Sequence, residues 1–79
     1  MIRFGERVTL TTGQTPVLRG FSPGIGKAFV EHDQPVLRQV NDGTSIGYGT
    51  RVWVDAPGFR EVRDRDGARV GMVHQTEGV

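Results

Sequence analysis

The sequence predicts a small all-β protein, and three observations lead to this fold class. Apolar and polar residues alternate along several short stretches, which is the pattern of half-buried strands. Turn-forming groups rich in glycine, proline, aspartate and asparagine recur at intervals of about 8 to 12 residues. Every window with a helical apolar pattern contains a glycine or a proline. We therefore expect a single domain, residues 1–79, folded as a small barrel of five to seven short antiparallel strands.

The first two expected strands lie near the N-terminus. Residues 7–12 alternate aliphatic side chains with threonines and end at Gly13. Residues 17–21 form the second strand, between a proline and a Ser-Pro-Gly turn. The two ends of the chain, residues 1–5 and 75–79, fall outside the expected strands. We expect these ends to be mobile or held by a partner.

The middle of the chain predicts three more strands. Residues 28–32 and 36–40 alternate, and the second of these strands ends at an Asn-Asp-Gly turn, residues 41–43. Two glycines interrupt residues 46–54. They predict a bend or bulge before a clear strand at residues 51–55.

The C-terminal stretch, residues 59–73, predicts a β-hairpin around the turn Asp64-Arg65-Asp66-Gly67. Gly67 takes a positive φ without steric penalty. A two-residue loop would scatter the apolar residues over both faces of the hairpin, whereas a three-residue loop with Gly67 in a bulge places Val62 opposite Val70. The two-residue loop would pair Asp64 with Arg69, but a cross-strand ion pair contributes only about 0.2 to 1 kcal/mol. Burial of each aliphatic side chain contributes about 1.5 to 3 kcal/mol. We therefore expect the three-residue loop.

This register has two consequences for the hairpin. It gathers four apolar side chains on the core face: Val62, Ala68, Val70 and Met72. It also places Arg63 opposite Arg69, a repulsion that Glu61 and Asp64 are expected to relieve.

The composition limits the sources of stability. A chain of 79 residues buries only about 60% of the surface that its unfolded form exposes. It has no cysteine and only two histidines, which excludes disulfides and leaves too few ligands for a closed metal site without several carboxylates. We expect no cofactor, and we expect a protein partner or copies of the same chain to add stability.

Charge and hydropathy limit the partners. Ten basic and nine acidic residues give a net charge of +1, without the basic excess of a nucleic-acid binder, so nucleic acid is not the expected partner. No apolar run reaches the roughly 20 residues that span a bilayer, and the N-terminus lacks the apolar stretch of a secretion signal. We expect no membrane partner and a cytoplasmic or virion-associated protein.

Three motifs resemble chemical sites, but turn and strand structure explains them. Residues 22–27 look like a phosphate-binding loop, yet the glycine spacing differs and the chain continues as a strand. The 64–67 turn resembles a calcium loop in which valines replace the first and last ligands. His32 and Asp33 are adjacent on a strand and point to opposite faces. We expect neither an enzyme nor a small-molecule binder.

Trp53 is the strongest candidate for a contact residue. Val52 and Val54 are expected to point into the core, so Trp53 points the other way. It is expected either to pack on a second face or under a loop, or to be an exposed anchor of the kind that dominates interfaces. The expected partner-binding residues are Trp53, Tyr48, Arg51, Phe59, Ile25 and Lys27.

Residues 34–73 also resemble a bacterial SH3 domain. The resemblance rests on Val-Leu-Arg at 36–38, Gly-Thr-Arg-Val at 49–52, and a closing hairpin with Val-Arg at 62–63, Asp-Gly at 66–67 and Gly-Met-Val at 71–73. It implies a small SH3-like barrel. Barrels of this type look like many phage virion proteins, such as decoration and connector subunits, which are short, cysteine-free and stabilised by assembly.

Two functions follow as expectations. The first is a non-enzymatic interaction module that docks on a protein surface, as a repeated structural subunit of a larger assembly such as a phage particle. The alternative is a nucleic-acid-binding barrel in which Trp53 or Phe59 stacks a base and arginines hold phosphates.

Overall fold

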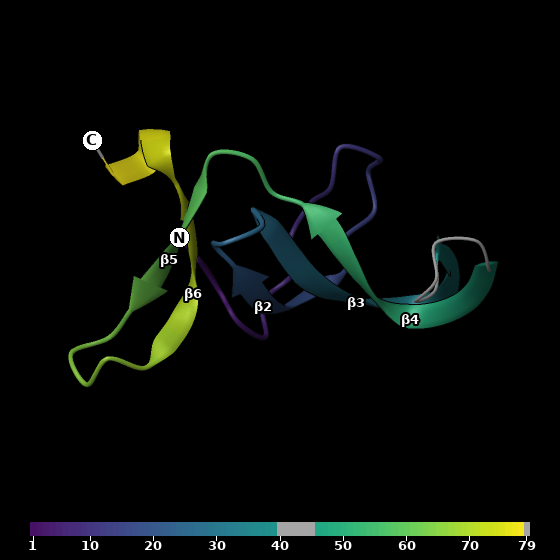
Figure 1. Ribbon diagram of the computed structural model, residues 1–79, viewed down its shortest axis with the longest axis horizontal. Helices are drawn as coiled ribbons and strands as arrows, with labels where there is room; N and C mark the ends of the chain where they lie inside the picture. The colour runs from purple at the N-terminus through teal and green to yellow at the C-terminus, as the bar shows by residue number, and fades with distance from the viewer. Residues whose placement is uncertain (40–45, 79) are drawn as a thin grey trace.

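The computed structural model describes residues 1–39 and 46–78, so the expected 41–43 turn lies outside the described residues. The described chain is all-β, as predicted, with six antiparallel strands in two three-stranded sheets of order β1-β6-β5 and β2-β3-β4 (Figure 1). The elements are β1 (Ile2–Arg3), β2 (Val17–Ser22), β3 (Lys27–Gln39), β4 (Ile46–Asp55), β5 (Phe59–Arg63), β6 (Arg69–His74) and a short 3-10 helix, η1 (Gln75–Gly78).

One apolar core draws its side chains from both sheets. Its buried members are Val8, Leu18, Phe21, Ala28, Val30, Ala56 and Met72. Val52 and Val54 are partly buried against this core, which confirms the predicted inward face of β4. The core is small, as expected for a chain of this length.

β3 joins two strands that the sequence predicts as separate. The register of β3 against β4 shifts between Glu31 and Val36, so residues 32–35 bulge out of the ladder. Pro35, which has no N–H to donate, lies in this bulge and removes no ladder hydrogen bond. The irregularity predicted for β4 at its glycines is therefore on the facing strand, and β4 itself is continuous.

Two expectations about the N-terminal segment are wrong. Residues 7–12 form no continuous strand, although the turn at Gly13 is where it was expected. The Val8 N–H donates to the carbonyl of Pro16 and the Leu10 N–H to that of Gln14. Proline has no N–H to donate in return, so the ladder stays incomplete and only Arg7 forms an isolated bridge. Residues 1–5, expected to be mobile or held by a partner, are tied into the fold. β1 pairs with β6, and the Gly5 N–H donates to the Leu18 carbonyl at 2.8 Å. β6 thereby has a neighbouring strand on both sides.

The C-terminal hairpin has the predicted three-residue loop. The Asp64 N–H donates to the Ala68 carbonyl at 2.9 Å, Gly67 has a φ of 83°, and Arg63 lies opposite Arg69. The predicted pairing of Val62 with Val70 is wrong, because a bulge at Val70 brings Val62 opposite a glycine.

Gly71 is that glycine, and it explains the shifted register. A Cβ at this position would lie 2.9 Å from the Arg3 Cα, so only glycine lets β1 approach β6 this closely. Of the four side chains expected in the core, only Met72 is buried there, and Ala68 is exposed. The pairing of β6 with β1 therefore overrides the register that the apolar pattern of the hairpin predicts.

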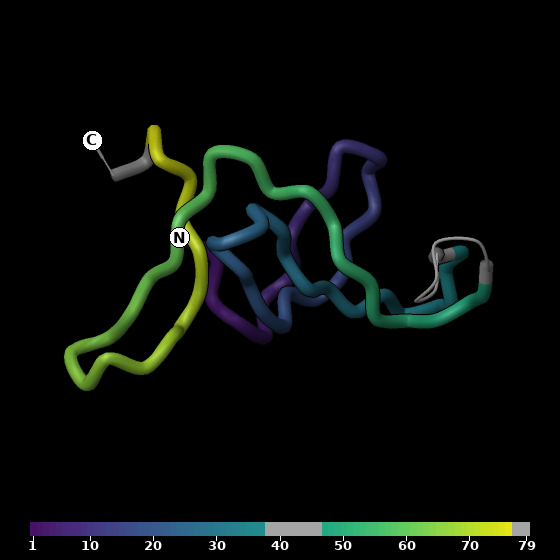
Figure 2. Tube along the Cα trace, viewed as in Figure 1, coloured from purple at the N-terminus to yellow at the C-terminus, as the bar shows by residue number. Residues whose placement is uncertain are grey.

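The described chain is elongated, with extents of 40 × 24 × 23 Å. Its radius of gyration is 13.3 Å, against about 12 Å for a compact chain of this length. The reason is visible in Figure 2, where the outer halves of β3 and β4 extend away from the two packed sheets. Two apolar side chains on this arm are largely uncovered: Leu37 is 60% exposed and Tyr48 is 75% exposed.

Candidate interaction surface

The outward face of the β2-β3-β4 sheet carries an aromatic pair. Phe29 and Trp53 are register partners on β3 and β4, and their ring centroids are 4.9 Å apart at an interplanar angle of 47°. Trp53 is 50% exposed. Trp53 therefore points outward as predicted, packs on one side against Phe29, and is not enclosed by a loop.

A glycine on β2 makes room beside the pair. Gly20 lies opposite Phe29, and a Cβ added at Gly20 would lie 3.6 Å from the Phe29 Cβ. Phe29 is thus placed between the bare backbone of β2 and the Trp53 ring. Such packing restrains both rings and leaves a shallow apolar centre on the sheet.

Ion pairs surround this aromatic centre. Arg19 Nε lies 3.0 Å from Glu31 Oε1, and Arg51 Nε lies 3.7 Å from the same oxygen. At the other end of the face, Lys27 Nζ lies 3.7 Å from Asp55 Oδ1. An apolar centre within a charged rim is the usual anatomy of a protein interface, and the rim here carries both signs of charge.

The structure separates the expected contact residues into different places. Trp53, Arg51 and Lys27 lie together on the outward face. Ile25 is exposed in the turn between β2 and β3, where the Gly26 N–H donates to the Ser22 carbonyl and β3 follows directly. This geometry agrees with the predicted plain turn. Phe59 packs against the core and meets the His74 ring edge to face at 5.2 Å.

Tyr48 lies on the opposite face from Trp53. Alternation along β4 places Tyr48 with Val52 and Val54, and its register partner is Leu37. An open groove of about 1180 Å³ follows this inner face of β3 and β4, bordered by residues 8–14 and the turn before β5. Proximity in sequence therefore does not bring Tyr48 and Trp53 into one patch.

Asp33 pairs with Arg7 and not with its neighbour His32. Arg7 Nη1 and Nη2 each donate to one Asp33 oxygen at 3.0 Å, and Nη1 also donates to the Thr15 carbonyl at 2.8 Å. The hydrogen bonds from Arg7, followed by its charge, lower the pKa of Asp33. This bidentate ion pair between Arg7 and Asp33 links the N-terminal segment to the bulge of β3. Nothing in the local sequence pattern indicates it, because the two residues are far apart in the chain.

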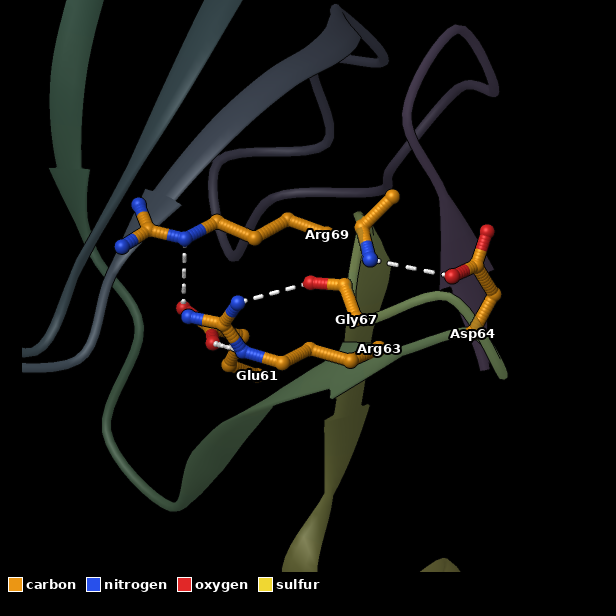
Figure 3. Close-up of polar contacts among 6 residues, drawn as sticks. Glu61, Arg63, Asp64, Gly67 and Arg69 are labelled. Atoms are coloured by element: carbon orange, nitrogen blue, oxygen red, sulfur yellow. Dashed lines mark hydrogen bonds and ion pairs between the residues drawn. The ribbon is translucent and has the colours of Figure 1, made fainter.

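The β5-β6 hairpin has its own polar cluster, centred on Glu61 (Figure 3). Arg63 Nε donates to Glu61 Oε1 at 2.6 Å, and Arg69 Nε lies 3.2 Å from Oε2. Oε2 is buried and accepts no well-directed hydrogen bond, so its partnership with Arg69 is electrostatic. Asp64 accepts the Asp66 and Ala68 N–H groups at 2.9 Å each. Glu61 relieves the arginine pair as predicted, whereas Asp64 shapes the turn.

Within residues 1–39 and 46–78, no group of three or more histidine, aspartate and glutamate side chains is arranged to hold a metal ion. The described part of the chain also contains no helix that is both long and apolar enough to cross a membrane.

We compared the chain with models of protein families, with curated proteins and with solved structures, and none of the three comparisons gave a match. The resemblance to bacterial SH3 domains therefore stays a prediction.

Proposed function

We propose that this protein is a non-enzymatic interaction module that docks on a protein surface through the outward face of its β2-β3-β4 sheet. The observation that carries the proposal is the half-exposed Trp53, held by Phe29 inside a rim of ion pairs. A tryptophan that is already restrained by a neighbour loses little side-chain entropy on binding, which is a property of interface anchors.

Small size supports a role as a repeated structural subunit of a larger assembly, such as a phage particle. The chain has a small core and an arm with large exposed apolar side chains. Burial of these side chains in an assembly would add stability that the isolated core lacks.

A nucleic-acid-binding barrel is the second candidate, because three cations flank Trp53: Arg19, Lys27 and Arg51. Each of them faces a carboxylate, so a phosphate would have to displace an existing ion pair. This arrangement favours a protein partner. Binding of nucleic acid at physiological salt, with a linear fall of log affinity against log salt concentration, would favour the second candidate instead.

A photo-crosslinking amino acid at position 53 tests the docking face. The matched control carries the same group at Arg65, which is exposed at the tip of the β5-β6 hairpin. We expect position 53, and not position 65, to capture a discrete protein other than a second copy of this chain in the native source. Adducts only with nucleic acid, or equal labelling from both positions, would contradict the proposal.

The affinity for the captured protein then measures the contribution of Trp53. Trp53→Ala is expected to weaken binding about 30-fold, in keeping with a loss of about 2 kcal/mol at an interface anchor. Leu37→Ala is the control, because it removes an apolar side chain that is at least as exposed, from the opposite face of the sheet.

A further inference from the structure

β4 leaves one of its two edges unpaired. It is the outer strand of the β2-β3-β4 sheet and runs for ten residues. In the described part of the chain, the backbone of β4 makes hydrogen bonds only with β3. A long open edge is a template for another strand, and proteins usually cover or interrupt such edges.

The register shows which backbone groups face the open edge. The Ala56 N–H donates to the Gly26 carbonyl, directly beyond the pair Lys27 and Asp55. Gly26 and Ala56 therefore form a hydrogen-bonded pair, and in an antiparallel ladder such pairs alternate with non-hydrogen-bonded ones. Within residues 51–55, which pair with β3 on one side of the register shift, the N–H and C=O groups of Arg51, Trp53 and Asp55 consequently point away from β3.

These three residues are complementary to themselves in the antiparallel direction. When two β4 strands align with Trp53 opposite Trp53 of the second copy, Arg51 faces Asp55 of the second copy on both sides of the symmetry axis. All three residues then hold the positions of hydrogen-bonded pairs. A pairing centred on Arg51 would instead set arginine against arginine.

The open edge of β5 lacks this complementarity. Since the Gln75 N–H donates to the Gly58 carbonyl, the same alternation turns the backbone groups of Phe59 and Glu61 outward. A symmetric pairing centred on Glu61 would place two glutamates opposite each other, which is unfavourable. The open edge of β4 is therefore better suited than that of β5 to pair with a second copy of the same strand.

We propose that a second copy of this chain pairs antiparallel along the β4 edge, about a two-fold axis at Trp53, so that the three-stranded sheets of two protomers form one continuous sheet. The interface is isologous, because the same residues serve both copies. It also brings both Phe29–Trp53 pairs together on one outward face. This inference uses the backbone edge of β4 and does not depend on the docking function of the face.

Charge reversal tests the register. Arg51→Asp and Asp55→Arg each replace two attractive cross-strand pairs with two repulsive ones, so each should raise the dimer dissociation constant at least about tenfold in sedimentation experiments. The double variant should restore the dissociation constant to within about threefold of the original. Reversal also disturbs the contacts of Arg51 with Glu31 and of Asp55 with Lys27 within each copy. Rescue in the double variant, where both disturbances persist, therefore reports pairing between copies.

A cysteine at position 53 gives a second test, because the natural chain contains no cysteine. Hydrogen-bonded antiparallel partners have Cα atoms about 5.5 Å apart, within the range that a disulfide spans. Trp53→Cys should form a disulfide-linked dimer under mild oxidation, whereas Arg65→Cys should not.

Three outcomes would overturn the inference: a chain that is monomeric up to about millimolar concentration, single charge reversals without effect, or a double variant that is not rescued. Circular dichroism on each variant shows that the fold is retained. If the chain does not form this dimer, the docking proposal still stands, because the crosslinking experiment detects a different protein that binds the outward face.

Discussion

Glu61 is the one carboxylate that contacts both arginines facing each other across the β5-β6 hairpin in the described residues. The three-residue loop sets Arg63 opposite Arg69, and the carboxylate of Glu61 lies between them with only 15% of its side chain exposed. Like charges directly opposite on paired strands are destabilising. Glu61 thus supplies the negative charge that offsets the repulsion between these two arginines.

Glu61→Gln should lower the free energy of unfolding by about 1 kcal/mol, because it removes the charge and leaves the two arginines opposed. Chemical denaturation monitored by circular dichroism measures the change. Asp66→Asn is the matched control: it removes one negative charge from the same hairpin at an exposed position, and its effect should be close to zero. Equal effects of the two substitutions would mean that net charge, and not the local contact, is responsible.

Asp33 should titrate below the ordinary range of aspartate because of its hydrogen bonds with Arg7. A lowered pKa in the folded state means that the pair stabilises the fold fully above the ordinary pKa of about 4 and loses this contribution as the pH falls through the folded-state pKa. A carbon-detected NMR titration measures the pKa of Asp33. In Arg7→Gln it should rise to the ordinary value, and an unchanged pKa would show that Arg7 is not the cause.

The strands show where local pattern suffices and where it does not. Residues 17–21, 51–55 and the three-residue loop of the hairpin follow their local pattern, because alternation and a positive-φ glycine are properties of neighbouring residues. β1 and the merged β3 could not be predicted in this way. Their pairing depends on segments distant in sequence, and β1 is too short to show any alternation.

Gly71→Ala tests the packing of β1 on β6. A Cβ at this position would meet the backbone of Ile2 and Arg3, which cannot move aside without leaving the sheet. We expect a loss of about 2 kcal/mol or more in unfolding free energy, together with faster proteolysis of the N-terminal residues.

Gly20→Ala is the control for this prediction. Its Cβ would lie 3.6 Å from the Phe29 Cβ, which is ordinary contact, so the loss should be much smaller. An equal loss at both positions would show that the glycine backbone itself, and not the approach of β1, determines the effect.

For the whole molecule, the important quantity is the balance between a small core and large exposed apolar side chains. The elongated chain leaves Trp53, Tyr48 and Leu37 mostly or half exposed, on two faces of one hairpin. Association would cover these side chains, and mass action then links stability to concentration.

The melting temperature should therefore rise with protein concentration. Differential scanning calorimetry over a hundredfold range of concentration measures this, and a rise of several degrees is expected for a dimer that is only partly formed at the lower end. A melting temperature independent of concentration, with a single monomeric species in light scattering, would contradict self-association.

The candidate surface was partly accessible from sequence. The outward direction of Trp53 follows from the alternation of its neighbours on β4. Its contact with Phe29, the charged rim and the separation of Tyr48 onto the other face do not, because each depends on which strand lies beside β4 and in which register. Position along one strand gives the face of a residue, but it does not give the neighbours on that face.

The all-β class, the turn at Gly67 and the outward placement of Trp53 follow from the residues of short segments, since these features depend on φ preferences and on a period of two residues. Four other features become visible in the folded chain alone: β1 pairs with β6, Val70 is bulged, Arg7 binds Asp33, and β4 has an open edge. Each of these features depends on contacts between segments that are distant in sequence. Which of these contacts form is decided by the packing of the whole molecule.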